Sequence, residues 1–324
     1  MKSIFATIAL LLALPSLKAQ TSLPSYVDVS THFFVNYSHE REEPNDRVYF
    51  AKKKDGWHVQ VVDLAKDEAV KTDQLFWNLE KNSYQSLKGF GPGISLEEAE
   101  KKVYDALEGD DSPFAYGYAR CRYFGYNEWD ADMIKDFGET AISSDTLLEG
   151  LARAYSSYAD RYCWNIDGGI SFDNDPLKSK LGRLELPSRE RINKFLFYIN
   201  KSIDCYARLN RMKPGYRMLI GSPQMKLVNE LFFVYQQLNI AGYKDLAKEW
   251  LDKIPGDDSI YTGLGYAYLS SCAPNSILIT FGDNDTYPLW YVQQKKGFRK
   301  DVTVINNSLL GFAPYVNMLK EIRQ

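Results

Sequence analysis

Two kinds of hydrophobic spacing divide this chain. Up to residue 93, short apolar stretches alternate with polar residues, which is the pattern of β-strands. In RVYFAKKKDGWHVQVVDL, Val48 and Phe50 can share a face with Trp57 across a turn at Asp55 and Gly56, because glycine tolerates a positive φ. Two further short strands, QLFWNLE and SYQSLKGF, precede the interruption at GPG. Residues 20–93 therefore predict a small β-rich unit.

From Ser95 onwards the apolar residues recur every three or four positions, as on helices. Ser95 and Glu98 stand in capping-box positions at the start of SLEEAEKKVYDAL. Two later segments carry one-sided apolar stripes, formed by Leu148, Leu151, Tyr155, Tyr158 and Tyr162, and by Ile192, Phe195, Ile199, Ile203 and Tyr206. Residues 94–272 therefore predict a helical domain.

Part of this domain has the pattern of a helical hairpin. Ser222 and Pro223 suit the start of one helix, Gly242 suits its end, and YKDLAKEWLDKI supplies a partner helix that Pro255 terminates. The pair resembles a tetratricopeptide repeat, although the first-helix Trp and Leu-Gly signature is absent, and LARAYSSYA is a looser second match. The resemblance implies a stacked array with a groove for proteins or peptides. An irregular helical bundle is the alternative.

The last segment, residues 273–324, alternates in type. SILITF reads as a buried strand, TYPLWYVQQKKG as a helix and DVTVINNSLL as a second strand. Strand, helix and strand in this order form a βαβ unit with parallel strands, as in Rossmann-like folds. Two parallel strands are few for such a sheet, so the unit looks incomplete. The chain as a whole is predicted to be α+β and mainly helical.

Ligands of βαβ units gather where the strands end and the helix begins. The ligand-binding candidates in this region are Gly282, Asp283, Asn284, Asp285, Thr286 and Trp290. Asp283 and Asp285 have the Asp-x-Asp spacing with which metal-dependent sugar transferases hold a divalent ion against a diphosphate. The other interpretation is structural: Asp285 or Thr286 caps the helix, and Asp283 favours its positive end. The residue types alone favour the cap.

The same segment resembles a known family. Over residues 275–310, the Gly-Asp-Asn-Asp-Thr turn at 282–286, the helix start at 287–291 and the Asp-Val pair at 301–302 are similar to a soluble segment of bacterial proteins related to protein O-mannosyltransferases. The transferase chemistry of that family belongs to a membrane domain to which no segment here corresponds. The resemblance therefore implies a soluble module and assigns it no catalytic residue.

The leader indicates a cellular compartment. Met1 and Lys2 precede the apolar stretch IFATIALLLAL, and the small residue Ala19 stands before Gln20. This is the anatomy of a secretory signal over residues 1–19, with an uncleaved anchor as the alternative. We expect an exported protein, periplasmic or associated with the cell envelope, without a membrane span after signal cleavage, because no later segment approaches ~20 apolar residues. With 39 basic and 42 acidic side chains, the composition does not favour nucleic-acid binding.

Other reactive residue types give weaker signals. The cysteines lack zinc-ligand spacing, and either disulfides or buried free thiols fit them. They are Cys121, Cys163, Cys205 and Cys272. Asp173 and Asp175 flank Asn174 in a polar stretch of a kind that can hold calcium, but the spacing lacks the full calcium-loop pattern and favours a solvated turn. The histidines lie in the N-terminal unit, away from the acidic turn, at His32, His39 and His58.

These observations favour an exported binding or scaffold protein over an enzyme. Its partner would be a protein or peptide in the helical groove, or a glycan, and the sequence requires no cofactor. The alternative is an enzyme or accessory factor of protein O-glycosylation that acts on a glycan or phosphate ligand with a divalent cation at Asp283 and Asp285. A third reading makes the chain a glycosylation substrate, since Asp145-Thr146-Leu147 and Asp258-Ser259-Ile260 resemble an acceptor pattern.

Overall fold

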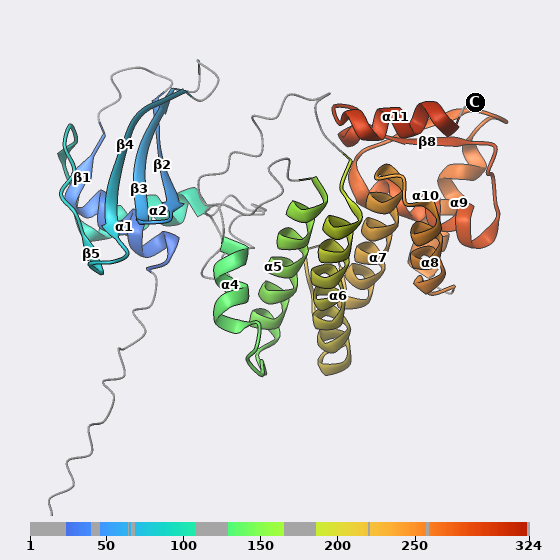
Figure 1. The fold of residues 1–324 in the computed structure, drawn as a ribbon, viewed down its shortest axis with the longest axis horizontal. Helices are drawn as coiled ribbons and strands as arrows, with labels where there is room; N and C mark the ends of the chain where they lie inside the picture. The colour runs from blue at the N-terminus through green and yellow to red at the C-terminus, as the bar shows by residue number, and fades with distance from the viewer. Residues whose placement is uncertain are drawn as a thin grey trace, which may run out of the picture.

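The computed structural model describes residues 24–39, 46–63, 65, 69–107, 129–164, 186–219, 221–256 and 259–322. An N-terminal sheet with helices, a layer of helices and a C-terminal module follow one another from one end of the molecule to the other (Figure 1). The α+β, mainly helical class expected from the sequence is confirmed.

The N-terminal sheet is antiparallel, with its strands in chain order. It consists of β2 (Asp46–Lys53), β3 (Gly56–Asp63), β4 (Ala69–Asn78) and β5 (Ser83–Tyr84), and a separate small pair joins β1 (Tyr37–Ser38) to β6 (Gly91–Pro92). The expected hairpin at Asp55 and Gly56 is confirmed, with Phe50 opposite Val59. Only the two residues of β5 form a strand within SYQSLKGF.

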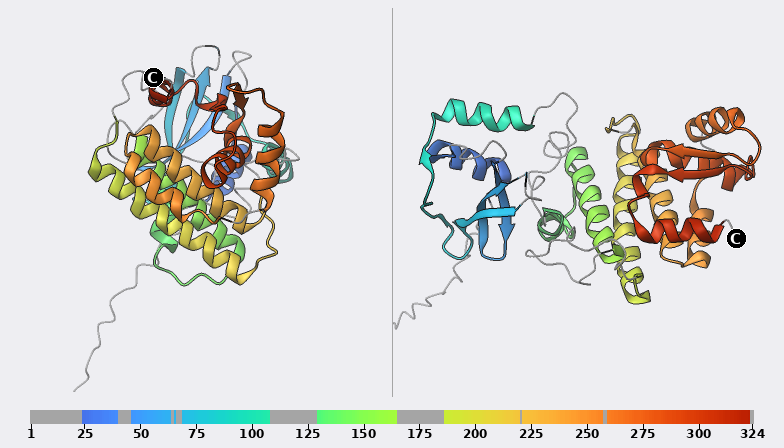
Figure 2. Two further views of the ribbon diagram at one scale, coloured as in Figure 1. Left: turned by 90° about the vertical axis from the view of Figure 1, so that its right-hand side faces the viewer. Right: turned by 90° about the horizontal axis from the view of Figure 1, so that it is seen from above.

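Two helices accompany this sheet, one against the strands and the other on the outer side of the first (Figure 2). The first, α1 (Tyr26–Asn36), was not expected from the sequence, and the capping box of Ser25 and Asp28 starts it. Its Val29 and Phe33 are buried in the core of the sheet. The second, α2 (Leu96–Leu107), has the expected capping box of Ser95 and Glu98 and packs on α1. The helix that the sequence analysis assigned to the helical domain therefore packs within the N-terminal unit.

The central layer consists of α4 (Trp129–Phe137), α5 (Asp145–Trp164), α6 (Arg189–Met212), α7 (Pro223–Ile240) and α8 (Lys244–Lys253). Successive helices pack side by side, and an ion pair of 2.6 Å between Lys52 and Asp132 joins the layer to the sheet. The apolar stripes expected on α5 and α6 face the interior, although Tyr158, Tyr162 and Ile203 are only partly buried. Ser222 caps α7 as expected. The match to tetratricopeptide repeats stays a prediction.

The C-terminal module contains β7 (Ile277–Thr280), α10 (Gly282–Lys296), β8 (Thr303–Asn306), the 3-10 turn η2 (Asn307–Leu309) and α11 (Ala313–Ile322). The strands are parallel, with Ile277 opposite Thr303 and Thr280 opposite Asn306, so the predicted βαβ unit is confirmed. The preceding helix, α9 (Ser259–Ser271), packs closely on α10. The residues of α9, which the sequence analysis placed in the helical domain, therefore pack with the module.

The remaining sequence signals have mixed outcomes. Cys163, Cys205 and Cys272 are free thiols, whereas Cys121 lies outside the described residues. The Asp173–Asp175 stretch also lies outside them. In the possible acceptor sequences, Thr146 is exposed in the first turn of α5, and Asp258 is not among the described residues. Within the part of the chain that the structure describes, no helix is long and apolar enough to cross a membrane.

Candidate functional site

The acidic turn forms the first turn of α10. The helix begins at Gly282, whose φ is +72°, and the N-cap residue Phe281 provides no side-chain hydrogen bond. The expectation that Asp285 or Thr286 caps the helix is therefore wrong, because both residues lie inside the helix. Instead, Asn306 at the end of β8 accepts a hydrogen bond of 3.2 Å from the Gly282 N–H. A side chain from the neighbouring strand thus satisfies an amide that the helix leaves open.

Thr286 has a structural role at the same place. Its side chain is fully buried, and its hydroxyl donates to the Gly282 carbonyl at 2.6 Å. The same hydroxyl lies 2.7 Å from that of Thr280 at the end of β7, which in turn lies 3.2 Å from the Ile305 carbonyl of β8. The two hydroxyls therefore join the helix start to both strand ends, and neither faces solvent.

Asp283 connects the module to the helical layer. Its Oδ2 accepts a hydrogen bond of 2.8 Å from the Asn229 amide of α7, and the Asn229 Oδ1 accepts one of 3.1 Å from Lys226. Lys226 pairs with Glu230 at 2.6 Å, and Glu230 accepts a hydrogen bond of 2.9 Å from Ser156 of α5. Asn229 and Glu230 are buried. A continuous chain of polar contacts therefore links α10, α7 and α5.

Beside this chain lies Asp160, a carboxylate that the sequence analysis did not single out. Its Oδ1 is shielded from solvent and has no hydrogen-bond partner among the described residues. Burial, together with the charge of Glu230, raises the pKa of Asp160 to about 6. Burial, with Asp283 and Glu230 adding to it, also raises the pKa of Tyr287. Asp160 and Tyr287 therefore keep their protons to a higher pH than they would in water, because each would carry its charge in a poorly solvated space near other negative groups.

The geometry gives no support for joint metal binding by Asp283 and Asp285. Residues two apart on a helix point about 200° away from each other. Asp283 is part-buried against Asn229, whereas Asp285 and Asn284 are exposed. The described residues contain no group of three or more His, Cys, Asp or Glu side chains placed to hold an ion. A cation at this pair stays a prediction.

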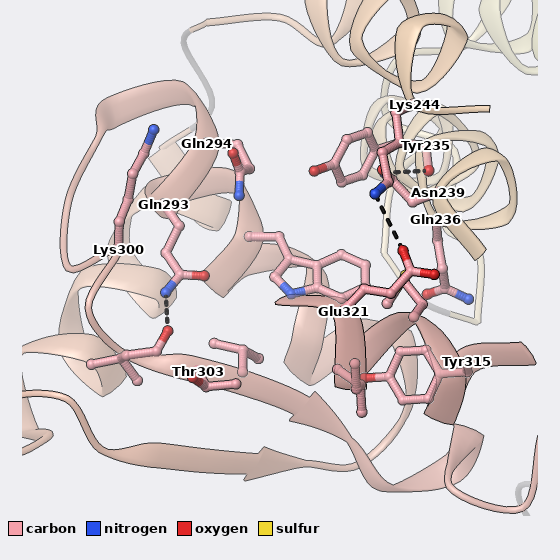
Figure 3. A pocket seen from close by; sticks show the side chains of 15 residues that line it. Tyr235, Gln236, Asn239, Lys244, Gln293, Gln294, Lys300, Thr303, Tyr315 and Glu321 are labelled. Carbon is pink, nitrogen blue, oxygen red and sulfur yellow. Dashed lines mark hydrogen bonds and ion pairs between the residues drawn. The ribbon is translucent and has the colours of Figure 1, made fainter. Parts of the chain in front are cut away.

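Trp290, the sixth candidate, lies at a different site. It lines a pocket of about 450 Å³ between α7, the start of α8, α10, β8 and α11 (Figure 3). The indole ring packs edge-on against Tyr235 of α7, with the ring centroids 6.2 Å apart. Polar side chains make up much of the remaining lining, namely Gln236, Asn239, Lys244, Gln293, Gln294, Lys300 and Glu321. Of the six candidates, the structure therefore brings only Trp290 to this pocket.

The amides of the pocket are not equivalent. Gln236 is only 6% exposed, and its Oε1 has no hydrogen-bond partner among the described residues. The Gln293 Nε2 donates to the carbonyls of Arg299 at 2.9 Å and Val302 at 2.8 Å, which fixes this amide and leaves its Oε1 outside both bonds. Gln294 is exposed. Both helices carry a Gln-Gln pair in the sequence, a signal that could have indicated shared polar walls.

Charge in the pocket is nearly balanced. Lys244 of α8 lies 3.3 Å from Glu321 of α11, and both side chains are more than 60% exposed. Lys300 is exposed at the other end of the pocket (Figure 3). One lysine is therefore neutralised by a carboxylate of the same lining, and the surplus is a single positive charge.

Comparison with known proteins concerns the C-terminal module alone. Residues 261–323 match the family model described as TMEM260-associated domain 2. The comparisons with curated proteins and with solved structures gave no match. The matched segment starts in α9 and ends with α11, so it coincides with the module that the packing defines. The C-terminal module is thus similar to TMEM260-associated domain 2, which is consistent with the resemblance to O-mannosyltransferase-related proteins seen in the sequence.

Proposed function

We propose that the chain is an exported, non-catalytic binding protein of the cell envelope. In this proposal, the helical layer acts as a scaffold for the C-terminal module, and the pocket between them takes a ligand. The proposal rests on one observation: the pocket is lined from one side by α7 and α8 of the helical layer and from the other by α10, β8 and α11 of the module. A site built at such a junction is the usual place for a ligand in a protein of several parts.

The acidic turn supports a scaffold role rather than catalysis. Asp283 is held by Asn229, Thr286 by Thr280 and Gly282, and the Gly282 N–H by Asn306. The bond between Asn229 and Asp283 connects the module to the layer, and the other bonds hold the start of α10 to the strand ends within the module. Asp285 of the same turn is exposed and takes no part in these bonds.

Aromatic packing makes the junction rigid. Phe232 of α7 stacks on Tyr287 of α10, with the centroids 5.4 Å apart and the ring planes 23° from parallel. The Tyr291 hydroxyl donates to the Pro255 carbonyl at 2.9 Å, and the Tyr261 hydroxyl donates to Met225 at 3.4 Å. Because these contacts fix both walls before any ligand arrives, binding would lose little conformational entropy.

The leader and the helical layer support the remaining parts of the proposal. Residues 1–19 have the composition of a secretory signal, which favours export. In this proposal the stacked helices bind a protein or peptide, as the helices of repeat proteins do. Amino-terminal sequencing of the protein from an envelope fraction tests export, with Gln20 as the expected first residue. A chain that keeps Met1 and stays inside the cell would refute it.

The indole N–H signals of the tryptophans test the binding site. Substitution of Trp290→Phe identifies the Trp290 signal in a ¹⁵N–¹H spectrum, and Trp250→Phe is the matched control in the same core. We expect a peptide or small-molecule fraction of an envelope extract to shift the Trp290 signal and to leave that of Trp250 in place. If no fraction shifts it, the pocket is not the binding site.

A metal titration tests the enzymatic alternative. Purified protein is titrated with calcium, manganese and magnesium while its melting temperature is followed, and Asp283→Asn and Asp285→Asn are titrated in parallel. We expect none of the ions to raise the melting temperature of the wild type through the acidic turn. If an ion raises it and both variants lose that rise, a metal site at the turn is favoured over the binding proposal.

A further inference from the structure

We propose that the pocket lined by Trp290 and Gln236 binds an uncharged saccharide of one or two sugar units. The inference rests on the proposed binding function and names the chemical class of its ligand. It is argued from the volume, the hydrogen-bonding groups and the charge of the pocket.

The volume suits such a ligand. Pockets for small molecules usually have volumes of about 300–1,000 Å³, and this one has about 450 Å³. Its walls combine aromatic and aliphatic side chains with several uncharged polar groups, and pockets for small molecules usually have such a mixed lining. The ligand that fits these walls is compact and has both apolar and polar surface.

The amides provide what hydroxyl groups need. A sugar hydroxyl both donates and accepts a hydrogen bond, and a carboxamide offers a carbonyl acceptor beside an N–H donor. The buried Gln236 Oε1 lacks a donor among the described residues, although buried polar atoms are normally paired. The Gln293 Oε1 is held in position through its own Nε2. The Gln236 Oε1 is therefore an unpaired acceptor to which a ligand hydroxyl can donate.

The indole of Trp290 provides the apolar contact. Its ring is held edge-on by Tyr235 and lies 5.7 Å from the Tyr287 ring, centroid to centroid. A rigid, flat ring that is already fixed loses little entropy when a ligand stacks on it. The C–H faces of a pyranose ring are flat and apolar, which suits such a surface.

Charge distinguishes a saccharide from a phosphate ligand. Phosphate recognition usually relies on several cationic donors, with arginine favoured for its bidentate geometry. The described lining residues include no arginine, and Lys244 is paired with Glu321 at 3.3 Å. Lys300 alone remains for an anion. The balance of charge therefore favours an uncharged ligand.

Tryptophan fluorescence of the full chain tests this inference. The probes are D-mannose, D-glucose, N-acetylglucosamine, maltose and inorganic phosphate. We expect at least one saccharide to change the fluorescence with a Kd of about 1 mM, the order given by a ligand of this size, and phosphate to be weaker. Trp290→Phe should lose the change, and Trp250→Phe should keep it.

Gln236→Met separates recognition from folding. Methionine has nearly the same shape but removes the unpaired oxygen, so we expect a melting temperature equal to or above that of the wild type. Saccharide binding should nevertheless weaken at least tenfold. The exposed Gln294→Ala is a second variant that should fold normally, with a smaller loss of affinity. A Gln236→Met variant that binds the saccharides unchanged would overturn the inference.

The other outcomes are also decisive. If peptides shift the Trp290 signal while no saccharide does, the saccharide assignment is wrong and the proposed binding function stands. If no ligand of either class reaches Trp290, both fail. If phosphate binds more tightly than every saccharide, the argument from charge is wrong.

Discussion

The contact between α9 and α10 depends on one glycine. A Cβ built on Gly265 would lie 2.4 Å from the Pro288 carbonyl oxygen and 2.4 Å from a methyl group of Val292. Two residues earlier on the same helix, Gly263 has no neighbouring atom within 4 Å of such a Cβ. The substitutions Gly265→Ala and Gly263→Ala therefore make the same chemical change in one helix. Only Gly265→Ala places the new methyl group against neighbouring atoms.

The two effects on stability can be estimated separately. Alanine in place of glycine stabilises a helix interior by about 0.5–1 kcal/mol, because it restricts the unfolded chain and suits the helix. Overpacking a tight contact costs about 1–3 kcal/mol, and here one of the obstructing atoms belongs to the backbone and cannot rotate away. We expect Gly263→Ala to be more stable than the wild type by about 0.5–1 kcal/mol. Gly265→Ala should be less stable by about 0.5–2 kcal/mol.

Urea unfolding followed by circular dichroism measures this difference. The midpoints of the two variants should move in opposite directions, with m-values close to that of the wild type. If Gly265→Ala is stabilised as much as Gly263→Ala, α9 does not pack on α10 as described. The module would then begin at β7, and the pocket would lose part of its support.

Three further substitutions test the junction and the acidic turn. Burial raises the folded-state pKa of Asp160 to about 6, so its contribution to stability is present below about pH 4 and is lost as the pH rises through 6. Asp160→Asn should therefore raise the unfolding free energy by about 1–3 kcal/mol at pH 8 and change it little near pH 4. Asn306→Ala removes the acceptor for the Gly282 and Ser308 amides, and thermal unfolding should show a loss of about 1–2 kcal/mol. Asp285→Asn changes an exposed residue, and thermal unfolding should show a change in the unfolding free energy of less than about 0.5 kcal/mol.

The βαβ module could be predicted because its signals are local. Each strand is a short apolar run, and the glycine and acidic residues between the first strand and the helix mark a turn. The start of α10 could not be predicted, since the residue that satisfies the Gly282 N–H is Asn306, which comes after the whole helix. The sequence favours Asp285 and Thr286 as caps because they are residues of the capping type that lie close to the start of the helix.

Two of the helices that were not predicted, α9 and α1, were missed for different reasons. The segment that forms α9, YTGLGYAYL, shows no periodicity, and its glycines normally disfavour a helix. It is helical because Gly265 allows close packing on α10, a tertiary effect. In α1, the capping signal of Ser25 and Asp28 was present in the sequence but was obscured by the β-like pattern that follows.

Of the residues that line the pocket, only Trp290 could be predicted from the sequence. Trp290 was recognised as an aromatic candidate beside the acidic turn, but the side chains that surround it come from helices distant in sequence. Gln236 precedes Trp290 by several elements, and its unpaired oxygen is visible only when α7 and the module are seen together. The carboxylate of Asp160 is similar: its raised pKa results from burial between helices.

The central claim is that the acidic turn joins the module to the helical layer, and a double-mutant cycle tests it most directly. The cycle combines Asn229→Ala on α7 with Asp283→Ala on α10, whose side chains are joined by a hydrogen bond of 2.8 Å. A charge-assisted, part-buried bond should give a coupling free energy of about 1–2 kcal/mol in unfolding. Additive effects, with a coupling below about 0.3 kcal/mol, would show that the turn does not hold the two parts together.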